Sequence, residues 1–362
     1  MHSSIFSSNT IRLSWKNWGA VICFFIVIFF LISPFWRTIE KFNPSPDYRL
    51  PYLLSSDYWL YRRWCKIASS QYSALVAGDS VVWGQYAGKS QTLSHYLNKT
   101  AGKNIFANVG VDGIHPAAMV GLIKYFGKDI KQKNVIINLN PLWMSSKRHD
   151  LSGEEEFRFN HPRLVPQMLP NIACYSPTFN EIMGIALERH IPFFSWLNHI
   201  RTNYFENLNI KEWNIQYPDI NPLSVISLKI PGPDNNPKSN PVTWQKRGIK
   251  IQDLPWMSAD DSFQWLSFKH VIEILIERDN NVFVVIGPFN PYILTAESKL
   301  RYQSLKHDME NWFKENNLDY YSVPDLPSDY YADGSHPLKE GYEKIAVDLF
   351  KTESFKKWMN NF

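Results

Sequence analysis

The chain has 362 residues and is 44% hydrophobic, enough for one large domain or two modest ones with a sizeable core. Its formal charge of +4 is small for this length and forms no dense Lys/Arg block, which excludes nucleic acid as the main partner. The sequence contains no C-x-x-C and no H-E-x-x-H pattern, so we expect neither a metal nor another cofactor.

The N-terminal segment predicts a membrane anchor. Residues 1–16 are polar and form the expected cytoplasmic tail, and residues 17–36 are an uncharged run. As a helix this run spans the roughly 30 Å hydrocarbon core of a bilayer. A cleaved signal peptide is the competing interpretation, but no small-x-small cleavage site follows the run. We therefore expect a single-pass protein of the cell membrane, with its large C-terminal domain outside the cytoplasm.

A stalk is expected between the anchor and the domain. Residues 37–67 begin with a proline-containing stretch and continue into a Trp/Tyr-rich stretch that predicts a juxtamembrane helix. The domain itself then occupies residues 68–362. Cys65 and Cys174 can pair if this domain lies in an oxidising compartment, although sequence alone does not place them within bonding range.

The first strand of the domain leads into the strongest chemical signal of the chain. Residues 74–77 form a short apolar run typical of a buried strand, and Gly78-Asp79-Ser80 ends it abruptly. A serine at the carboxyl end of such a strand lies where open α/β sheets place their ligand crevices. Taken alone, the triplet is equally typical of an ordinary turn.

Strands and helices alternate through most of the remaining chain, which predicts a three-layer α/β/α sandwich around a parallel sheet. Residues 145–260 interrupt this alternation with an insertion rich in Pro and Asn. We interpret the insertion as a lid or an acceptor-binding element, the alternative being a decorated surface without a ligand. The other expected strands are residues 104–109, 133–140, 281–286 and 318–323, and the main expected helices are residues 89–99, 116–130, 260–278, 295–316 and 338–350.

A second motif near the C-terminus supplies a partner for Ser80. Asp333 and His336 are three residues apart, so one tight turn lets the carboxylate hold the imidazole. A serine, a histidine and an orienting acid are the components of nucleophilic acyl transfer.

Together these motifs resemble the SGNH, or GDSL-type, hydrolases and acyltransferases, whose domain is a flavodoxin-like α/β sandwich. The resemblance rests on Gly78-Asp79-Ser80, on Asp333-Gly-Ser-His336 and, more weakly, on the stretch from Asn108 to Gly113. It implies that Ser80 is the nucleophile, His336 the base and Asp333 its orienting acid. It also implies that the backbone N–H groups of Ser80 and Gly113 contribute to the oxyanion hole.

The third strand departs from the pattern of that family. The family places a further oxyanion-hole asparagine at the position that is Leu142 in this chain, and Asn140 stands two residues earlier. Side chains alternate along a strand, so Asn138 and Asn140 should point to one face. Two roles for Asn140 remain open: it donates to the oxyanion, or it caps the turn that begins at Pro141.

The anchor, the aromatic content of 15% and the long insertion favour a polymer of the cell envelope as the substrate. The chain resembles membrane-anchored SGNH proteins that O-acetylate polysaccharides such as alginate, or that move D-alanine to teichoic acid. That resemblance implies a membrane acyl-donor protein as a further partner. We expect an extracytoplasmic serine esterase or O-acyltransferase acting on acyl esters of an envelope polysaccharide. The alternative is a non-catalytic scaffold or glycan-binding protein that keeps the fold, which the altered third strand favours.

Overall fold

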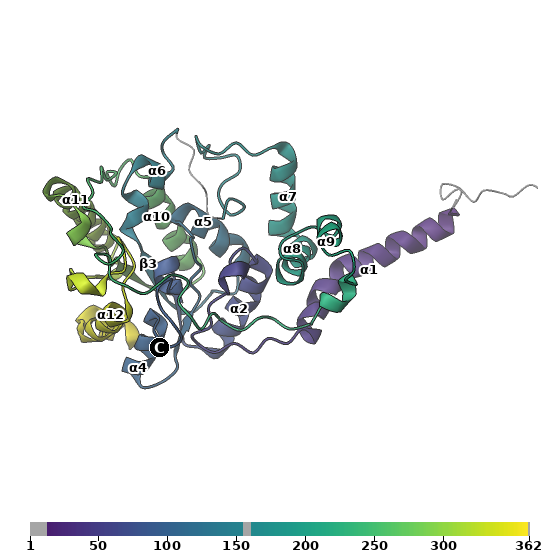
Figure 1. The fold of residues 1–362 in the computed structure, drawn as a ribbon, viewed down its shortest axis with the longest axis horizontal. Helices are drawn as coiled ribbons and strands as arrows, with labels where there is room; N and C mark the ends of the chain where they lie inside the picture. Colours follow the sequence, from purple (N-terminus) through teal and green to yellow (C-terminus); the bar gives the residue numbers. More distant parts are fainter. Residues whose placement is uncertain (1–12, 155–160, 361–362) are drawn as a thin grey trace, which may run out of the picture.

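A parallel sheet of five strands forms the centre of the domain in the computed structural model, which describes residues 13–154 and 161–360 (Figure 1). The strand order is β2-β1-β3-β4-β5, the doubly wound order of flavodoxin-like proteins. The predicted three-layer α/β/α architecture is therefore confirmed. The strands are β1 (Ala74–Ala77), β2 (Phe106–Asn108), β3 (Asn134–Leu139), β4 (Asn281–Ile286) and β5 (Asp319–Ser322).

The three inner strands are apolar along most of their length because both of their faces are covered. Alternate residues of each strand enter opposite hydrophobic clusters: Leu75 and Ala77 pack on one side of the sheet, and Ala74 and Val76 on the other. The edge strand β5, of sequence Asp-Tyr-Tyr-Ser, is only half-buried.

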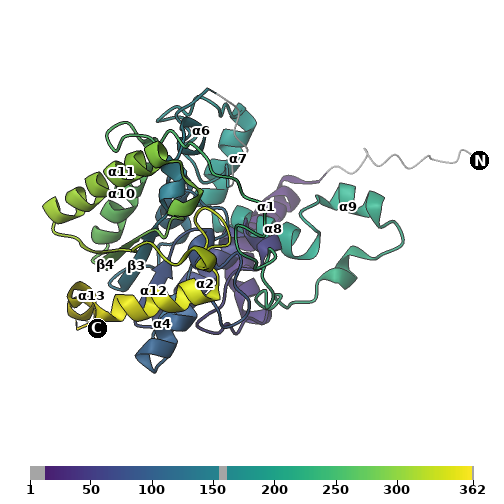
Figure 2. The same cartoon turned by 60° about the vertical axis from the view of Figure 1, so that its left-hand side comes forward.

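Helices cover both faces of the sheet (Figure 2). One face packs against α2 (Tyr58–Gln71), α5 (Pro116–Gly121), α10 (Phe263–Ile276) and α11 (Ala296–Glu315). The other face packs against α4 (Leu93–Ala101), α12 (Lys339–Lys351) and α13 (Glu353–Met359). Shorter helices are α3 (Ser80–Trp83) and α6 (Lys147–Asp150), with a π-helical turn at Leu122–Phe126 and 3-10 turns at Tyr52–Leu54, Pro141–Met144, Pro222–Val225, Pro291–Ile293 and Ser328–Tyr330.

One long helix, α1 (Trp15–Ile39), projects from the domain and contains the predicted span of residues 17–36 (Figure 1). Within the described residues it is the one helix that is long and apolar enough to cross a membrane. The insertion lies on the same side of the domain as α1. It contributes α7 (Phe179–His190), α8 (Pro192–Tyr204) and α9 (Ile210–Gln216).

The region expected to be a stalk packs against the domain over much of its length. Tyr48 and Leu50 belong to the main hydrophobic cluster, and most of α2 is buried. Arg49 is buried as well, and its guanidinium donates to the carbonyls of Gly84 (2.7 Å) and Asp234 (2.7 Å). Cys65 is buried and Cys174 is half-buried, and both thiols are free.

Candidate active site

Ser80 lies at the carboxyl end of β1, on the turn that begins α3. A Cβ atom at Gly78 would lie 2.5 Å from Val82 Cγ2, so only glycine lets the backbone turn this closely. Asp79 caps α3, and its carboxylate accepts the Val81 N–H at 2.9 Å. The turn holds Ser80 at the edge of the sheet where the topology places a ligand crevice.

The structure brings Ser80, His336 and Asp333 together as one chain of hydrogen bonds. Ser80 Oγ lies 2.8 Å from His336 Nε2, and His336 Nδ1 lies 2.8 and 2.9 Å from the two carboxylate oxygens of Asp333. An Nδ1–H that donates to the carboxylate leaves Nε2 free to accept the serine proton. The arrangement therefore has the connectivity of a nucleophile, a base and an orienting acid.

The tight turn between Asp333 and His336 fixes the acid as the sequence spacing predicts. Asp333 Oδ1 also accepts the backbone N–H groups of Ser335 (3.0 Å) and His336 (2.9 Å). Burial opposes ionisation of Asp333, but the His336 charge and these hydrogen bonds outweigh it and hold the pKa of this carboxyl well below its usual value. Burial likewise opposes protonation of His336, yet Asp333 raises the pKa of the imidazole above its usual value.

A cavity of about 380 Å³ lies in front of Ser80 and His336. Two of its wall residues, His161 and Lys238, come from the insertion, so this segment helps to form the candidate site. Sequence reasoning did not single out either residue, because no motif surrounds them. The remaining wall residues are Tyr52, Ser55, Ser56, Gln85, Asp112, Gly113, Leu142 and Trp143.

His161 holds the peptide group that precedes Gly113. Its Nε2 donates to the Asp112 carbonyl at 2.8 Å, and its Nδ1 accepts the Tyr58 hydroxyl at 3.1 Å. Burial lowers the pKa of His161, which favours this neutral form. Because C=O and N–H point in opposite directions across a trans peptide, this bond turns the Gly113 N–H away from His161.

Gly113 has a φ of 72°, a left-handed conformation that favours glycine. Within the described part of the chain, the backbone N–H groups of Gly113 and Ser80 have no hydrogen-bond acceptor. Both residues line the cavity. Two free N–H groups beside a serine nucleophile can receive the negative charge that develops on an attacked carbonyl oxygen.

Asp112 and Lys238 form an ion pair in the cavity wall. Lys238 Nζ lies 2.7 Å from Asp112 Oδ2 and 3.7 Å from the centre of the Tyr52 ring. The pair joins the loop after β2 to the insertion, and the ring contact joins both to the segment before α2. Three distant stretches of sequence thereby meet at one wall of the cavity.

Asn140 is positioned as a cap of the turn after β3. Its side-chain oxygen accepts the Leu142 N–H at 3.1 Å, and its amide donates to Asp79 Oδ2 at 2.7 Å. The Trp143 indole N–H donates to the same Asp79 oxygen at 2.9 Å. In the described structure, Leu142 and Trp143 line the cavity and Asn140 is not among its lining residues. Of the two roles left open by the sequence, the geometry is that of the cap.

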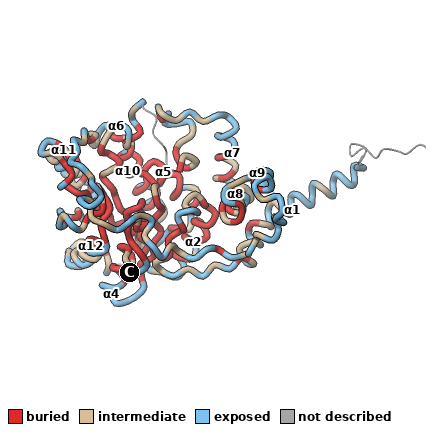
Figure 3. Tube along the Cα trace, in the orientation of Figure 1, coloured by how far each residue is buried: buried red, intermediate tan, exposed pale blue. Residues whose placement is uncertain are grey.

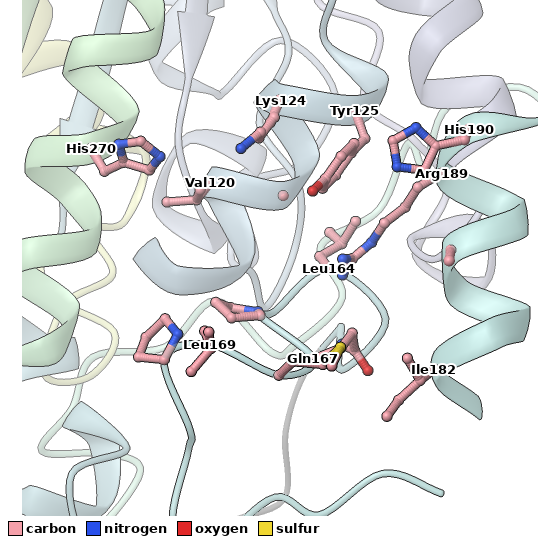
Figure 4. A pocket seen from close by; sticks show the side chains of 15 residues that line it. Val120, Lys124, Tyr125, Leu164, Gln167, Leu169, Ile182, Arg189, His190 and His270 are labelled. Atoms are coloured by element: carbon pink, nitrogen blue, oxygen red, sulfur yellow. The ribbon is translucent and has the colours of Figure 1, made fainter. Parts of the chain in front are cut away.

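A second cavity, of about 480 Å³, lies between α5, α7 and α10 (Figure 4). Lys124, Arg189, His190 and His270 give it a basic lining, beside apolar side chains such as Leu164. Among its described lining residues there is no serine, threonine, cysteine or carboxylate, so it supplies no nucleophile paired with a base. No group of three or more His, Cys, Asp or Glu residues in the described chain could hold a metal ion.

In sequence, no known family profile and no curated protein matches the chain. Among solved structures, the chain is similar to a protein from Desulfitobacterium hafniense that is assigned to the lipolytic G-D-S-L family. The similarity covers 76% of this chain and 96% of that one, with 10% sequence identity and a TM-score of 0.35. A similarity of this size supports no conclusion about function, which is argued below from the site itself.

Proposed function

We propose that this protein is a membrane-anchored serine esterase or O-acyltransferase of the SGNH type. The observation that carries the proposal is the hydrogen-bonded chain from Ser80 through His336 to Asp333, at a cavity that two free backbone N–H groups also face. A serine with no such partners would be a weak nucleophile at neutral pH.

The proposed reaction has two steps. Ser80 Oγ attacks the carbonyl carbon of an acyl ester while His336 Nε2 takes the serine proton, and Asp333 stabilises the resulting imidazolium. The proton then passes to the leaving alkoxide, which leaves an acyl group on Ser80. In the second step a hydroxyl group or water attacks this acyl-enzyme while His336 takes its proton, and His336 then returns a proton to the Ser80 oxygen as it leaves. Water as the acceptor gives an esterase, and a hydroxyl of a glycan gives an O-acyltransferase.

The oxyanion hole in this proposal consists of the N–H groups of Ser80 and Gly113. Each preorganised donor of this kind typically stabilises the transition state by about 3 kcal/mol. The bond from His161 to the Asp112 carbonyl keeps the Gly113 N–H in one orientation, so we assign His161 as a positioning residue. Asn140 has no part in the hole, since its amide is directed to Asp79.

Contacts of α1 support a retained anchor over a cleaved signal sequence. Ser33 Oγ in α1 accepts the Trp59 indole N–H at 2.9 Å, and the Phe29 ring stacks on Phe193 at 4.7 Å. Glu40, directly after α1, is buried and accepts a hydrogen bond from Arg63 at 2.7 Å. Cleavage within or after this helix would remove packing that the domain uses, so we propose that α1 holds the domain at the outer face of the cell membrane.

An acyl ester of an envelope polysaccharide is the substrate class that fits this location. The cavity wall offers hydroxyl, amide and charged groups that can bind a polyhydroxylated ligand. A membrane acyl-donor protein as the source of the acyl group belongs to the same proposal. Such a donor in the membrane would explain why the proposed nucleophile, Ser80, is held close to the bilayer by the anchor α1.

Labelling with a fluorophosphonate probe tests whether Ser80 is an activated nucleophile. We expect the wild-type protein to be labelled and to hydrolyse 4-nitrophenyl acetate, and the Ser80→Ala variant to lose both properties. Ser90→Ala, which changes an exposed serine on a nearby loop, is the matched control and should retain both. A wild-type protein that is folded but unlabelled at Ser80 would favour the non-catalytic scaffold.

A further inference from the structure

The free part of α1 is too short to cross a membrane. The helix has 25 residues, but its ring contacts with the described domain begin at Phe29. The part of α1 that projects from the domain is mostly exposed (Figure 3). The 14 positions from Trp15 to Ile28 rise only about 21 Å at 1.5 Å per residue, whereas the hydrocarbon core is roughly 30 Å thick. If α1 spans the bilayer, the part of the domain that touches its second half must lie inside the leaflet.

The element that touches this part of α1 is the beginning of α8. Phe29 stacks on Phe193 with ring centres 4.7 Å apart, and it meets the edge of Phe194 at 5.7 Å. Further along, Trp36 contacts Trp196 at 5.6 Å. With the outer limit of the hydrocarbon core at Trp36, Phe29 lies about 10 Å below that limit, and the start of α8 lies beside it.

The surface around this contact is suited to lipid. Pro192 is exposed, Phe193 and Phe194 are half-buried, and Leu197 is exposed one turn further along α8. Because Phe193 and Phe194 contact Phe29, this apolar surface adjoins that of α1. Arg189 and His190, which directly precede them at the end of α7, belong instead to the lining of the second cavity (Figure 4), where Arg189 donates to the carbonyls of Arg163 and Val165.

We propose that residues 192–197, the beginning of α8, enter the leaflet on the domain's side of the membrane. The inference rests on the proposed role of α1 as an anchor. It identifies lipid as the molecule that covers this surface. The exposed apolar side chains adjoin a helix whose own partner is the bilayer, and a soluble partner would have to reach them below the hydrocarbon boundary. The insertion thus has two roles. It contributes His161 and Lys238 to the cavity, and it holds the domain against the membrane.

Fluorescence quenching on the full-length protein tests this placement. A thiol-reactive nitrobenzoxadiazole label is attached at three positions in separate samples: native Cys23 in α1, Pro192→Cys, and Leu300→Cys on α11. The Cys23 sample also carries Cys174→Ser, the two variants carry both Cys23→Ser and Cys174→Ser, and buried Cys65 is left in place in all three. Each sample is reconstituted into vesicles of phosphatidylcholine with a minority of phosphatidylglycerol, with or without a nitroxide on the upper part of the acyl chains.

We expect the nitroxide to quench the labels at positions 23 and 192 to a similar extent and to leave the label at 300 unchanged. Leu300 is exposed on α11, and α11 lies on the opposite side of the domain from α1 (Figure 1), which makes this position the matched control. Quenching at 23 without quenching at 192 would overturn the inference and leave the anchor intact, since the bilayer would then have thinned around α1. No quenching at 23 would overturn both. Equal quenching at 300 would also overturn the inference, because the domain would then enter lipid without a defined face.

Thermal melts show whether each labelled protein is still folded, so that quenching can be compared between the samples. Pro192 is the first residue of α8, where a cysteine removes no hydrogen bond and no core packing. The labelled Pro192→Cys protein should therefore melt within a few degrees of the labelled Leu300→Cys protein. Quenching at 192 in a protein that melts normally supports the inference.

Discussion

His336 and His199 are both buried beside carboxylates, but they differ in what lies at the second ring nitrogen. His336 has Asp333 on Nδ1 and the Ser80 hydroxyl on Nε2, at the edge of a cavity. His199 has Asp57 on Nδ1 at 2.6 Å and Glu40 on Nε2 at 2.9 Å. One histidine can exchange a proton with a hydroxyl, and the other is held between two acids.

The second carboxylate changes the chemistry of the imidazole. Burial alone would lower the pKa of His199, but Asp57 and Glu40 outweigh it and raise the pKa to about 9. A histidine that stays charged at neutral pH donates from both nitrogens and cannot act as a base. His199 therefore joins the end of α1 to α2 and α8, whereas His336 can exchange a proton with Ser80, as the proposed acyl transfer requires. The comparison shows that the partner at the second nitrogen, more than burial, separates a structural histidine from a reactive one.

The two regions to compare are the catalytic candidate around His336 and the cluster around His199. Replacing the acid beside each histidine should give the largest difference between them, in kcat for the first region and in stability for the second. Asp333→Asn should lower kcat by roughly 10⁴-fold in a protein that remains folded, because the amide favours the wrong tautomer of His336. The rate of 4-nitrophenyl acetate hydrolysis and a thermal melt measure the two quantities.

The matched variant in the second region is Asp57→Asn. Asp57 also caps α2, accepting the Leu60 N–H at 2.9 Å, so this change removes a charge from a buried network. We expect it to reduce the free energy of unfolding by about 3–5 kcal/mol and to leave kcat of the folded protein nearly unchanged. A parallel fall in kcat for Asp57→Asn would contradict the separation of the two histidines.

The pH dependence of stability should reveal whether the His199 imidazole is charged in the folded protein. Because folding raises the pKa of this imidazole from 6.5 to about 9, its stabilising contribution is fully present below pH 6.5 and is lost as the pH rises through about 9. At 1.36 kcal/mol per pKa unit, the contribution is about 3 kcal/mol. Melting temperatures measured from acidic to alkaline pH should fall across this window, and more steeply than those of His199→Gln. Equal slopes for the two proteins would show that His199 is neutral when folded.

A smaller effect is expected at His161, which in the proposed mechanism acts on the reaction through Gly113. His161→Phe removes the hydrogen bond to the Asp112 carbonyl, so the Gly113 N–H loses its fixed direction. We expect kcat to fall by roughly tenfold to a hundredfold with KM nearly unchanged, less than the roughly 10²–10³-fold cost of removing a whole oxyanion donor.

Two further variants control this experiment. His161→Gln restores a donor to the carbonyl and should recover part of the lost kcat. Asn140→Ala removes a turn cap and should lower stability by about 1 kcal/mol with kcat nearly unchanged. A large loss of kcat in Asn140→Ala, with His161→Phe fully active, would assign the oxyanion to Asn140 instead.

The sequence by itself determined the features that depend on neighbouring residues. The apolar runs of β1, β3 and β4, the turn at Gly78 and the uncharged run inside α1 each need only a local pattern. The same holds for Asp333 and His336, because three residues of separation bring carboxylate and imidazole together in one turn. Pairing Ser80 with a histidine 256 positions away came from the resemblance of the motifs, and the parallel sheet accounts for it by bringing the two loops to one edge.

Tertiary structure alone decided the features that join distant segments. His161 and Lys238 reach the cavity because the insertion folds back over the loop after β2, and no local pattern encodes that contact. The sequence left two roles open for Asn140 for a related reason, because its role depends on a contact with Asp79, 61 positions earlier. The proline-containing segment before α2 resembles an exposed linker in sequence, yet Arg49 ties it to carbonyls of two other loops. Periodicity and turn chemistry act over a few residues, whereas packing selects among the partners that a folded chain brings within reach.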